Sequence, residues 1–184
     1  SSPTVVETRE PSASGDFGAD VLVGRDQEVA TALDALEQAI AGRGRVLVVT
    51  GEPGIGKSRI VREVLDRAAQ RGVRVGRGMW DPDPGPPLAG WRSALMGALG
   101  ALAPADDHGV RDAASEIYRL ADALSAPLRD RPTVLAFDDV HWADPDSLRL
   151  IRRFVALVDQ LPVLVVVAAR PLGLDAAAPL AELF

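Results

Sequence analysis

Three short runs of apolar residues, many of them β-branched, recur along the chain without alternating polar positions, over residues 46–50, 133–137 and 163–169. Residues 73–80 are a further candidate strand, although glycines interrupt them. A continuous apolar run of this length is typical of a strand that is buried on both faces of a parallel sheet. The pattern therefore predicts four strands of one parallel sheet.

Amphipathic segments lie between these runs. Apolar positions recur at helical spacing over residues 25–41, 57–70, 88–102, 110–128 and 146–160. Asp144 can cap the last of these helices, and Pro145 suits its first turn. Strands that alternate with helices predict an α/β fold, a parallel sheet sandwiched by helices. Right-handed crossovers then place the carboxyl ends of all strands at one edge, where the ligands of such sheets bind.

Two segments have a different composition. Residues 1–20 are rich in Ser, Pro, Gly and acidic residues, and they are predicted to be a linker or a disordered arm. Residues 81–87 read DPDPGPP, which predicts a stiff surface loop because proline fixes φ and removes a hydrogen-bond donor. We interpret the chain as a piece of a longer protein, with one domain over residues 21–184.

Charge and composition argue against several classes of function and of site for this segment. A net charge of -6 disfavours a nucleic-acid surface on this segment, so any DNA contact is expected from another domain. The chain has no cysteine, which excludes disulfides and thiolate sites. The longest apolar run is too short to span a bilayer, and no signal peptide opens the chain. We expect a cytoplasmic protein without a membrane partner.

The segment GEPGIGKS directly follows the first predicted strand and precedes an amphipathic helix. It matches the phosphate-binding pattern G-x-x-x-x-G-K-S in the strand–loop–helix context that this pattern requires. Glycines let backbone N–H groups surround a phosphate, Lys57 adds a charge for the terminal phosphates, and Ser58 offers a hydroxyl ligand to Mg²⁺. The predicted nucleotide-binding residues of this segment are Gly51, Glu52, Pro53, Gly54, Ile55, Gly56, Lys57, Ser58 and Arg59.

Two adjacent carboxylates end the third predicted strand. Asp138 is the predicted partner of Mg²⁺, because this ion prefers hard oxygen ligands and often binds them through water. Asp139 is predicted to point to the other side of the strand and to orient or deprotonate an attacking water, as a catalytic residue beside Lys57. A plain alternative is that Asp139 only caps a turn or pairs with a surface arginine.

Three further positions have two interpretations each. Arg170 follows the fourth strand, where it can reach a γ-phosphate as a catalytic residue or be a solvated arginine. His141 can contact the γ-phosphate or a neighbouring protomer, but a structural role is favoured. The segment that contains Val23, Gly24 and Arg25 can form a wall for the base or a helix staple.

Taken in order, LVGRDQE, VTGEPGIGKSRIV, VLAFDDVHWADPDSL and VVVAARP form one pattern. The pattern resembles the nucleotide-binding domain of STAND-class P-loop ATPases within the AAA+ superfamily, as in large ATP-binding LuxR-type and SARP-type bacterial transcriptional regulators. The resemblance covers about residues 21–171. It implies binding of ATP or ADP with Mg²⁺, slow hydrolysis used as a switch, and self-association in the ATP state. Lys57, Ser58, Asp138, Asp139 and Arg170 match the motif positions of that family.

Two departures from the family pattern have consequences. The second acid is Asp139 rather than the glutamate usual in AAA+ enzymes, which agrees with slow turnover. The family's last strand and helical lid are expected after residue 184, so the sheet is predicted to have the strand order 2-3-4-1 without a fifth strand. A stand-alone ATPase acting on a protein or small molecule is the alternative function, and an interaction module with an inactive loop is a third. The expected preference for ATP over GTP is inferred from the resemblance only, since the sequence contains no guanine-specific motif such as N-K-x-D that would decide the base.

Overall fold

The computed structural model describes residues 4–7, 26–52, 54, 56–83, 85–100 and 113–170. Its strands are β1 (Thr4–Glu7), β2 (Arg45–Thr50), β3 (Arg74–Met79), β4 (Thr133–Asp138) and β5 (Val163–Ala169). Its helices are α1 (Asp26–Ile40), α2 (Lys57–Gln70), α3 (Ala89–Leu99), α4 (Ala113–Arg129) and α5 (Pro145–Val155), with 3₁₀ turns η1 (Val140–Trp142) and η2 (Val158–Gln160). The strands form one sheet in the order β1-β2-β5-β4-β3, and every neighbouring pair is parallel.

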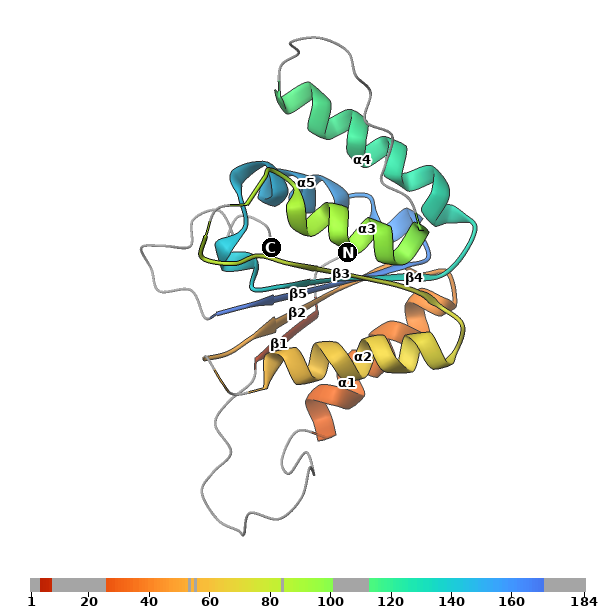
Figure 1. Ribbon diagram of the computed structural model, residues 1–184. Helices are drawn as coiled ribbons and strands as arrows, with labels where there is room; N and C mark the ends of the chain where they lie inside the picture. Colours follow the sequence, from red (N-terminus) through yellow and green to blue (C-terminus); the bar gives the residue numbers. More distant parts are fainter. Residues whose placement is uncertain are drawn as a thin grey trace.

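Helices cover both faces of this sheet. Figure 1 shows α1 and α2 below it and α3 and α5 above it, with α4 extending upward on the same side as α5. Alternate strand residues serve the two layers: Val46 and Val48 pack toward α3 and α5, whereas Leu47 and Val49 pack toward α1 and α2. The predicted α/β sandwich with a parallel sheet is confirmed, and so is the order of the four predicted strands.

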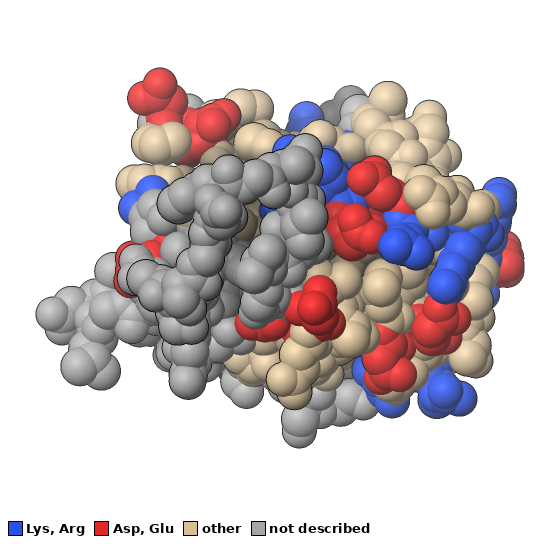
Figure 2. All heavy atoms as spheres, turned by 90° about the horizontal axis from the view of Figure 1, so that it is seen from below, with Lys and Arg blue, Asp and Glu red and all other residues tan. Residues whose placement is uncertain are grey.

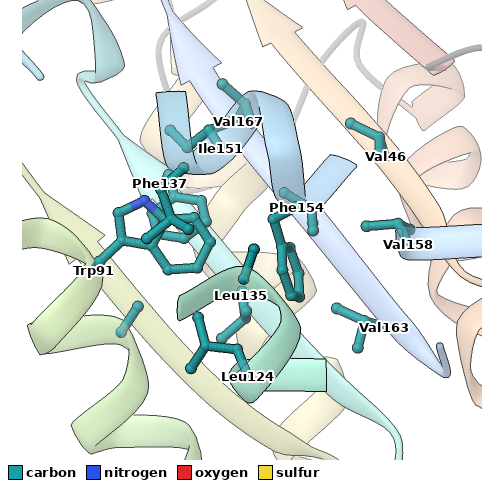
Figure 3. Packing of buried hydrophobic residues seen from close by; sticks show 14 of the residues in the cluster. Val46, Trp91, Leu124, Leu135, Phe137, Ile151, Phe154, Val158, Val163 and Val167 are labelled. Carbon is teal, nitrogen blue, oxygen red and sulfur yellow. The ribbon is translucent and has the colours of Figure 1, made fainter. Parts of the chain in front are cut away.

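The larger core is built around aromatic side chains that pack against one another on the upper face of the sheet (Figure 3). Phe137 on β4 lies 4.6 Å from the ring of Trp91 on α3, and Trp91 meets Phe154 on α5 edge-on at 5.5 Å. The indole N–H of Trp91 donates to the Ser147 carbonyl at 3.2 Å, so the ring is both packed and hydrogen-bonded. Aromatic pairs of this geometry add to the free energy gained by burial. They fix α3 and α5 on the strand that carries both acidic residues.

Glycines in β3 allow α3 to lie unusually close to the sheet. A Cβ atom at Gly76 would sit 1.9 Å from the Ala94 carbonyl oxygen, and one at Gly78 would sit 2.2 Å from the Gly90 oxygen. Both contacts are with helical backbone, which cannot yield without moving the helix. The glycines that interrupt the apolar pattern of this strand therefore serve the packing of helix on strand.

We expect Gly76→Ala to lower the free energy of unfolding by about 1–3 kcal/mol, because the added methyl group overpacks the contact with α3. Gly85→Ala is a matched control, since its Cβ would meet only the Ala89 side chain at 3.9 Å. Urea unfolding of both variants gives the comparison. Equal stability of the two variants would show that α3 does not lie as close to β3 as described.

The prediction of a linker over residues 1–20 is wrong for Thr4–Glu7, which form β1 at the edge of the sheet beside β2. Residues 8–20 lie outside the described residues. An edge strand needs only half of its side chains buried, and here Val6 is buried while Val5 is 60% exposed. Two valines in a polar segment give too weak a pattern for sequence reasoning to detect. The expected sheet without a fifth strand is thus corrected: β1 fills the position outside β2.

The helix predicted over residues 146–160 ends at Val155, and η2 follows it. Its start agrees with the prediction: Asp144 caps α5, with Pro145 in the first turn. One Asp144 oxygen accepts the Ser147 N–H at 2.9 Å, and the other accepts the Ser147 hydroxyl at 2.6 Å and the Leu88 N–H at 3.2 Å. Burial acts to raise the pKa of Asp144, but these hydrogen bonds outweigh it and hold the pKa below its ordinary value.

We expect Asp144→Ala to cost about 2 kcal/mol of stability, because it removes the cap of α5 and leaves the Leu88 N–H without its acceptor. A lowered pKa means that this contribution is present above the ordinary value of 3.8 and is lost as the pH falls through the lower folded value. Asp146→Ala is the control, since Asp146 only pairs with Arg149 at the exposed surface and should change stability by at most about 0.5 kcal/mol. Thermal unfolding at neutral and acidic pH tests both statements.

Charges of both signs alternate on the face formed by α1 and α2. Figure 2 shows acidic and basic side chains side by side over the described part of that face. Glu37 pairs with Arg71 across the two helices, and Glu63 pairs with Arg67 along α2. The described part of this face therefore has no extended basic area of the kind that binds phosphate backbones. None of the described helices has the length and apolar character needed to cross a membrane.

Candidate phosphate-binding site

Three neighbouring strands bring the predicted site residues to one edge of the sheet. β5 lies between β2 and β4, and in register Thr50 pairs with Ala169 while Phe137 pairs with Val167. The three strands therefore end at nearly the same level, and the residues that follow them lie at one edge of the sheet. At this edge lie the glycine-rich loop after β2, Asp138 at the end of β4 with Asp139 directly after it, and Arg170 after β5.

These segments enclose an open hollow of about 320 Å³. It is lined by Gly54, Gly56, Lys57, Ser58, Asp139 and Arg170, all of which are predicted site residues. Gly54 and Gly56 have φ of 81° and 92°, a backbone conformation that favours glycine. Nothing lies within 4 Å of the position that a Cβ of Gly54 would take. These two glycines therefore line the hollow at the start of α2 without adding a side chain to it.

The start of α2 lies at this hollow, since Lys57 and Ser58 line it. The helix begins at Lys57 with Gly56 as its cap, and the first N–H groups of a helix have no partner within it. Together with the helix dipole, such groups favour an anion at this point. A phosphate therefore fits the loop by charge, by hydrogen bonding and by space.

Lys57 is held inside the loop rather than in solvent. Its side-chain ammonium donates to the carbonyl oxygens of Gly51 at 2.6 Å and Glu52 at 2.9 Å, and the residue is only 7% exposed. Burial lowers the pKa of Lys57, and Arg170 lowers it further, while Asp139 acts to raise it. An ammonium has three N–H donors, so one remains for a ligand in the hollow.

The two acidic residues have different surroundings. Asp138 is 1% exposed and does not line the hollow, and its Oδ2 accepts a hydrogen bond from Arg77 at 2.7 Å. Asp139 has a φ of 53°, which turns the chain at the end of β4. Simple strand alternation predicted that Asp139 points to the other side of the strand. The structure shows that Asp139 lines the same hollow as Lys57 and Ser58, whereas Asp138 does not line it.

His141 lies beside Asp139, with 3.9 Å between its Nδ1 and an Asp139 carboxylate oxygen. Both ring nitrogens are buried and have no hydrogen-bond partner among the described residues. Burial lowers the pKa of His141, and the charges of Arg170 and Lys57 lower it further. The imidazole is therefore neutral at pH 7 and has one donor and one acceptor without a partner.

Other predicted residues stand outside the hollow. Glu52 and Arg59 are exposed on either side of the loop, and Gly51 is buried at its start. Val23, Gly24, Arg25, Pro53 and Ile55 lie outside the described residues. Sequence reasoning missed Arg77. A signal was available, because an arginine between two glycines of a sheet strand needs a partner.

A metal at this site would take few ligands from the protein. The described residues contain no group of three or more His, Asp or Glu side chains that could hold a metal ion. Mg²⁺ commonly takes one or two protein ligands and completes its shell with water and phosphate oxygens. Ser58 lines the hollow, and Asp138 lies near enough to Lys57 for its charge to act on that side chain, so their oxygens suit an Mg²⁺ ion that enters together with a phosphate.

Solved structures share this fold. The Aeropyrum pernix ORC1 protein, solved in complex with DNA, aligns with a TM-score of 0.59 and 25% identity over 88% of this chain and 43% of its own. Drosophila ORC bound to DNA aligns with a TM-score of 0.52 and 15% identity over 82% of this chain and 38% of that one. The second similarity shows the fold alone.

Two sequence comparisons, one with a relative and one with a family model, also find matches to this chain. An uncharacterised protein of Rhizobium meliloti (strain 1021) is 29% identical over 204 aligned residues, which cover 86% of this chain and 20% of that protein. The chain thus spans about a fifth of the length of this relative. The AAA ATPase domain family matches residues 21–166, a range that includes the glycine-rich loop and both acidic residues. The chain therefore belongs to the AAA ATPase domain family and has the P-loop NTPase fold of that family.

Proposed function

We propose that this chain binds ATP and ADP with Mg²⁺, hydrolyses ATP slowly, and acts as the switch domain of a larger bacterial transcriptional regulator. The proposal that the chain binds a nucleotide rests on one observation: two glycines, Lys57, Ser58, Asp139 and Arg170 line the same hollow. It combines an anion cradle, two cations and one carboxylate at the carboxyl edge of a parallel sheet. That combination supports binding of a polyphosphate and attack by water on its end.

Each side chain has a role that follows from its place. The loop N–H groups and Lys57 hold the phosphates, and Arg170 stabilises the negative charge that develops on the terminal one. Asp139 accepts a proton from the attacking water or orients it. Neutral His141, with both nitrogens free of described partners, supports its interpretation as a contact of the terminal phosphate. Mg²⁺, when bound through Ser58 and Asp138, would neutralise phosphate charge.

The switch part of the proposal rests on two supports. The motif pattern resembles STAND-class regulators, and the second acid is an aspartate rather than a glutamate, which favours slow turnover. The ORC structures contain DNA, but this chain has a net charge of -6 and interspersed surface charges. We therefore assign DNA contact to another domain and self-association to the ATP state of this one.

Calorimetric titration of ADP, ATP and GTP, each with Mg²⁺, tests the nucleotide part on this chain. We expect both adenine nucleotides to bind and GTP to bind at least tenfold more weakly. Equal binding of GTP would contradict the adenine assignment. Absence of binding by all three would overturn the proposal for this chain.

The switch part needs a separate measurement of size. Light scattering after gel filtration should show a monomer with ADP and a larger species with a non-hydrolysable ATP analogue. If the mass is the same in both states, self-association is not controlled by the nucleotide in this chain. Fast multiple-turnover hydrolysis that rises with an added protein or small molecule would instead favour a stand-alone ATPase.

A further inference from the structure

Asp138 is the most deeply buried acidic side chain of the site and is not alone there. Its side chain is 2% exposed, and Arg77 Nη2 lies 2.7 Å from its Oδ2. The backbone N–H of Asp139 donates to its Oδ1 at 3.2 Å. Each carboxylate oxygen therefore has one donor and keeps a free lone pair for a further partner.

Sheet register explains why Arg77 reaches this carboxylate. β3 and β4 pair in parallel with Met79 beside Asp138, and Arg77 precedes Met79 by two residues, so both point to the same face. Gly76 and Gly78 meet α3 on the upper face, which places Arg77 on the opposite face. Val134 and Ala136 on β4 belong to the core beneath the sheet, so Asp138 continues that row. This is the face of α2 and its phosphate loop.

Because Asp138 is buried, its ion pair with Arg77 strongly affects the carboxylate. A carboxylate removed from water without a partner is costly, and it responds by protonating or by turning away. A guanidinium is always charged and holds a carboxylate oxygen in a fixed direction. The Arg77 side chain is 35% exposed, so it keeps contact with solvent while Asp138 does not. Arg77 thus holds the Asp138 carboxylate in one orientation and leaves lone pairs of both oxygens free.

We propose that Arg77 is the positioning residue of the Mg²⁺ site: it holds the Asp138 carboxylate toward a metal that enters with the nucleotide. This inference rests on the proposed nucleotide binding. It assigns Arg77 no contact with the nucleotide. Removing such an outer partner of a metal ligand commonly lowers metal affinity 10- to 100-fold while leaving the rest of the site in place.

The test compares Arg77→Met and Arg77→Lys with the unaltered chain. A non-hydrolysable ATP analogue is titrated by calorimetry in Mg²⁺ and in EDTA, and the ratio of the two affinities reports the metal contribution. Mn²⁺ binding to the analogue complex, followed by electron paramagnetic resonance, gives a direct reading of the metal. Arg74→Met is the matched control, since Arg74 starts the same strand and its side chain donates to the Pro127 carbonyl at 3.1 Å.

For Arg77→Met we expect the Mg²⁺ contribution and the Mn²⁺ affinity to fall about tenfold, with affinity in EDTA within about twofold of the unaltered chain. Arg77→Lys should lose less, because it keeps the charge but not the planar donors. Arg74→Met should change neither quantity. Arg77→Lys also keeps the test decisive if the methionine variant does not fold.

Two results would overturn the inference while leaving nucleotide binding intact. An unchanged Mg²⁺ contribution in folded Arg77 variants would limit the pair to a structural role. A larger Mg²⁺ contribution would show that Arg77 competes with the metal for Asp138. If the unaltered chain binds no nucleotide in either buffer, the proposed function fails and the inference fails with it.

Discussion

Lys57→Ala should weaken the binding of ADP and ATP by about 10- to 100-fold, as expected when a charged group loses a hydrogen-bonding partner. The ammonium lies at the start of α2, lines the hollow and is already desolvated. Its charge is therefore little screened by water when a phosphate enters. The variant also leaves the Gly51 and Glu52 carbonyls without the donor that holds the loop. Both losses act in the same direction on affinity.

Two variants separate the charge from other effects. Lys57→Met keeps most of the side-chain volume and should lose as much affinity as Lys57→Ala. Arg62→Ala removes one positive charge from the exposed face of the same helix and should leave binding within about twofold. Calorimetry with ADP and Mg²⁺ measures all three. Unchanged affinity of both Lys57 variants would contradict the assignment of this hollow to phosphate.

The lowered pKa of Lys57 adds a pH dependence to this prediction. Because burial favours the neutral amine, Lys57 loses its proton below the ordinary value of 10.5. Nucleotide affinity should therefore fall as the pH rises toward that value, earlier than for a solvated lysine. The same titration in Lys57→Met should show no such fall.

Much of the fold could be predicted because its strands are buried on both faces. α2 and β5 have the predicted bounds, and the order of β2 to β5 is the one that the family resemblance implied. The candidate phosphate loop could be located because its motif residues are consecutive in the sequence. Four of these residues, Gly54, Gly56, Lys57 and Ser58, line one hollow.

Features that depend on distant partners could not be predicted. β1 is a strand because the edge of β2 offers backbone partners, and its own four residues carry little signal. The need for glycine at Gly76 and Gly78 comes from the close backbone of α3, whose position is not visible in the sequence of β3. Arg77 and Asp138 are 61 residues apart along the chain, and their pairing depends on the register of β3 with β4. The turn at Asp139 depends on a positive φ, which the alternation rule does not include.

Asp139→Asn should lower the rate of ATP hydrolysis by about 100-fold or more, the range expected for loss of a general base. Asp139 is the one carboxylate that lines the hollow together with Lys57 and Arg170 among the described residues. Asparagine tolerates the left-handed backbone that Asp139 adopts, so the turn into η1 should be kept. The substitution therefore removes the charge and the proton acceptor while it preserves the fold of the site.

Binding should respond differently from hydrolysis. Asp139 adds negative charge next to the place where phosphates lie, so its loss should leave ATP affinity unchanged or slightly higher. Asp138→Asn is the informative comparison, because it should weaken the Mg²⁺ contribution to binding as well as the rate. Single-turnover hydrolysis of radiolabelled ATP with the protein in excess measures a slow rate directly. Hydrolysis by Asp139→Asn at the rate of the unaltered chain would assign the base to another group, and neutral His141 beside it would then be the next variant to measure.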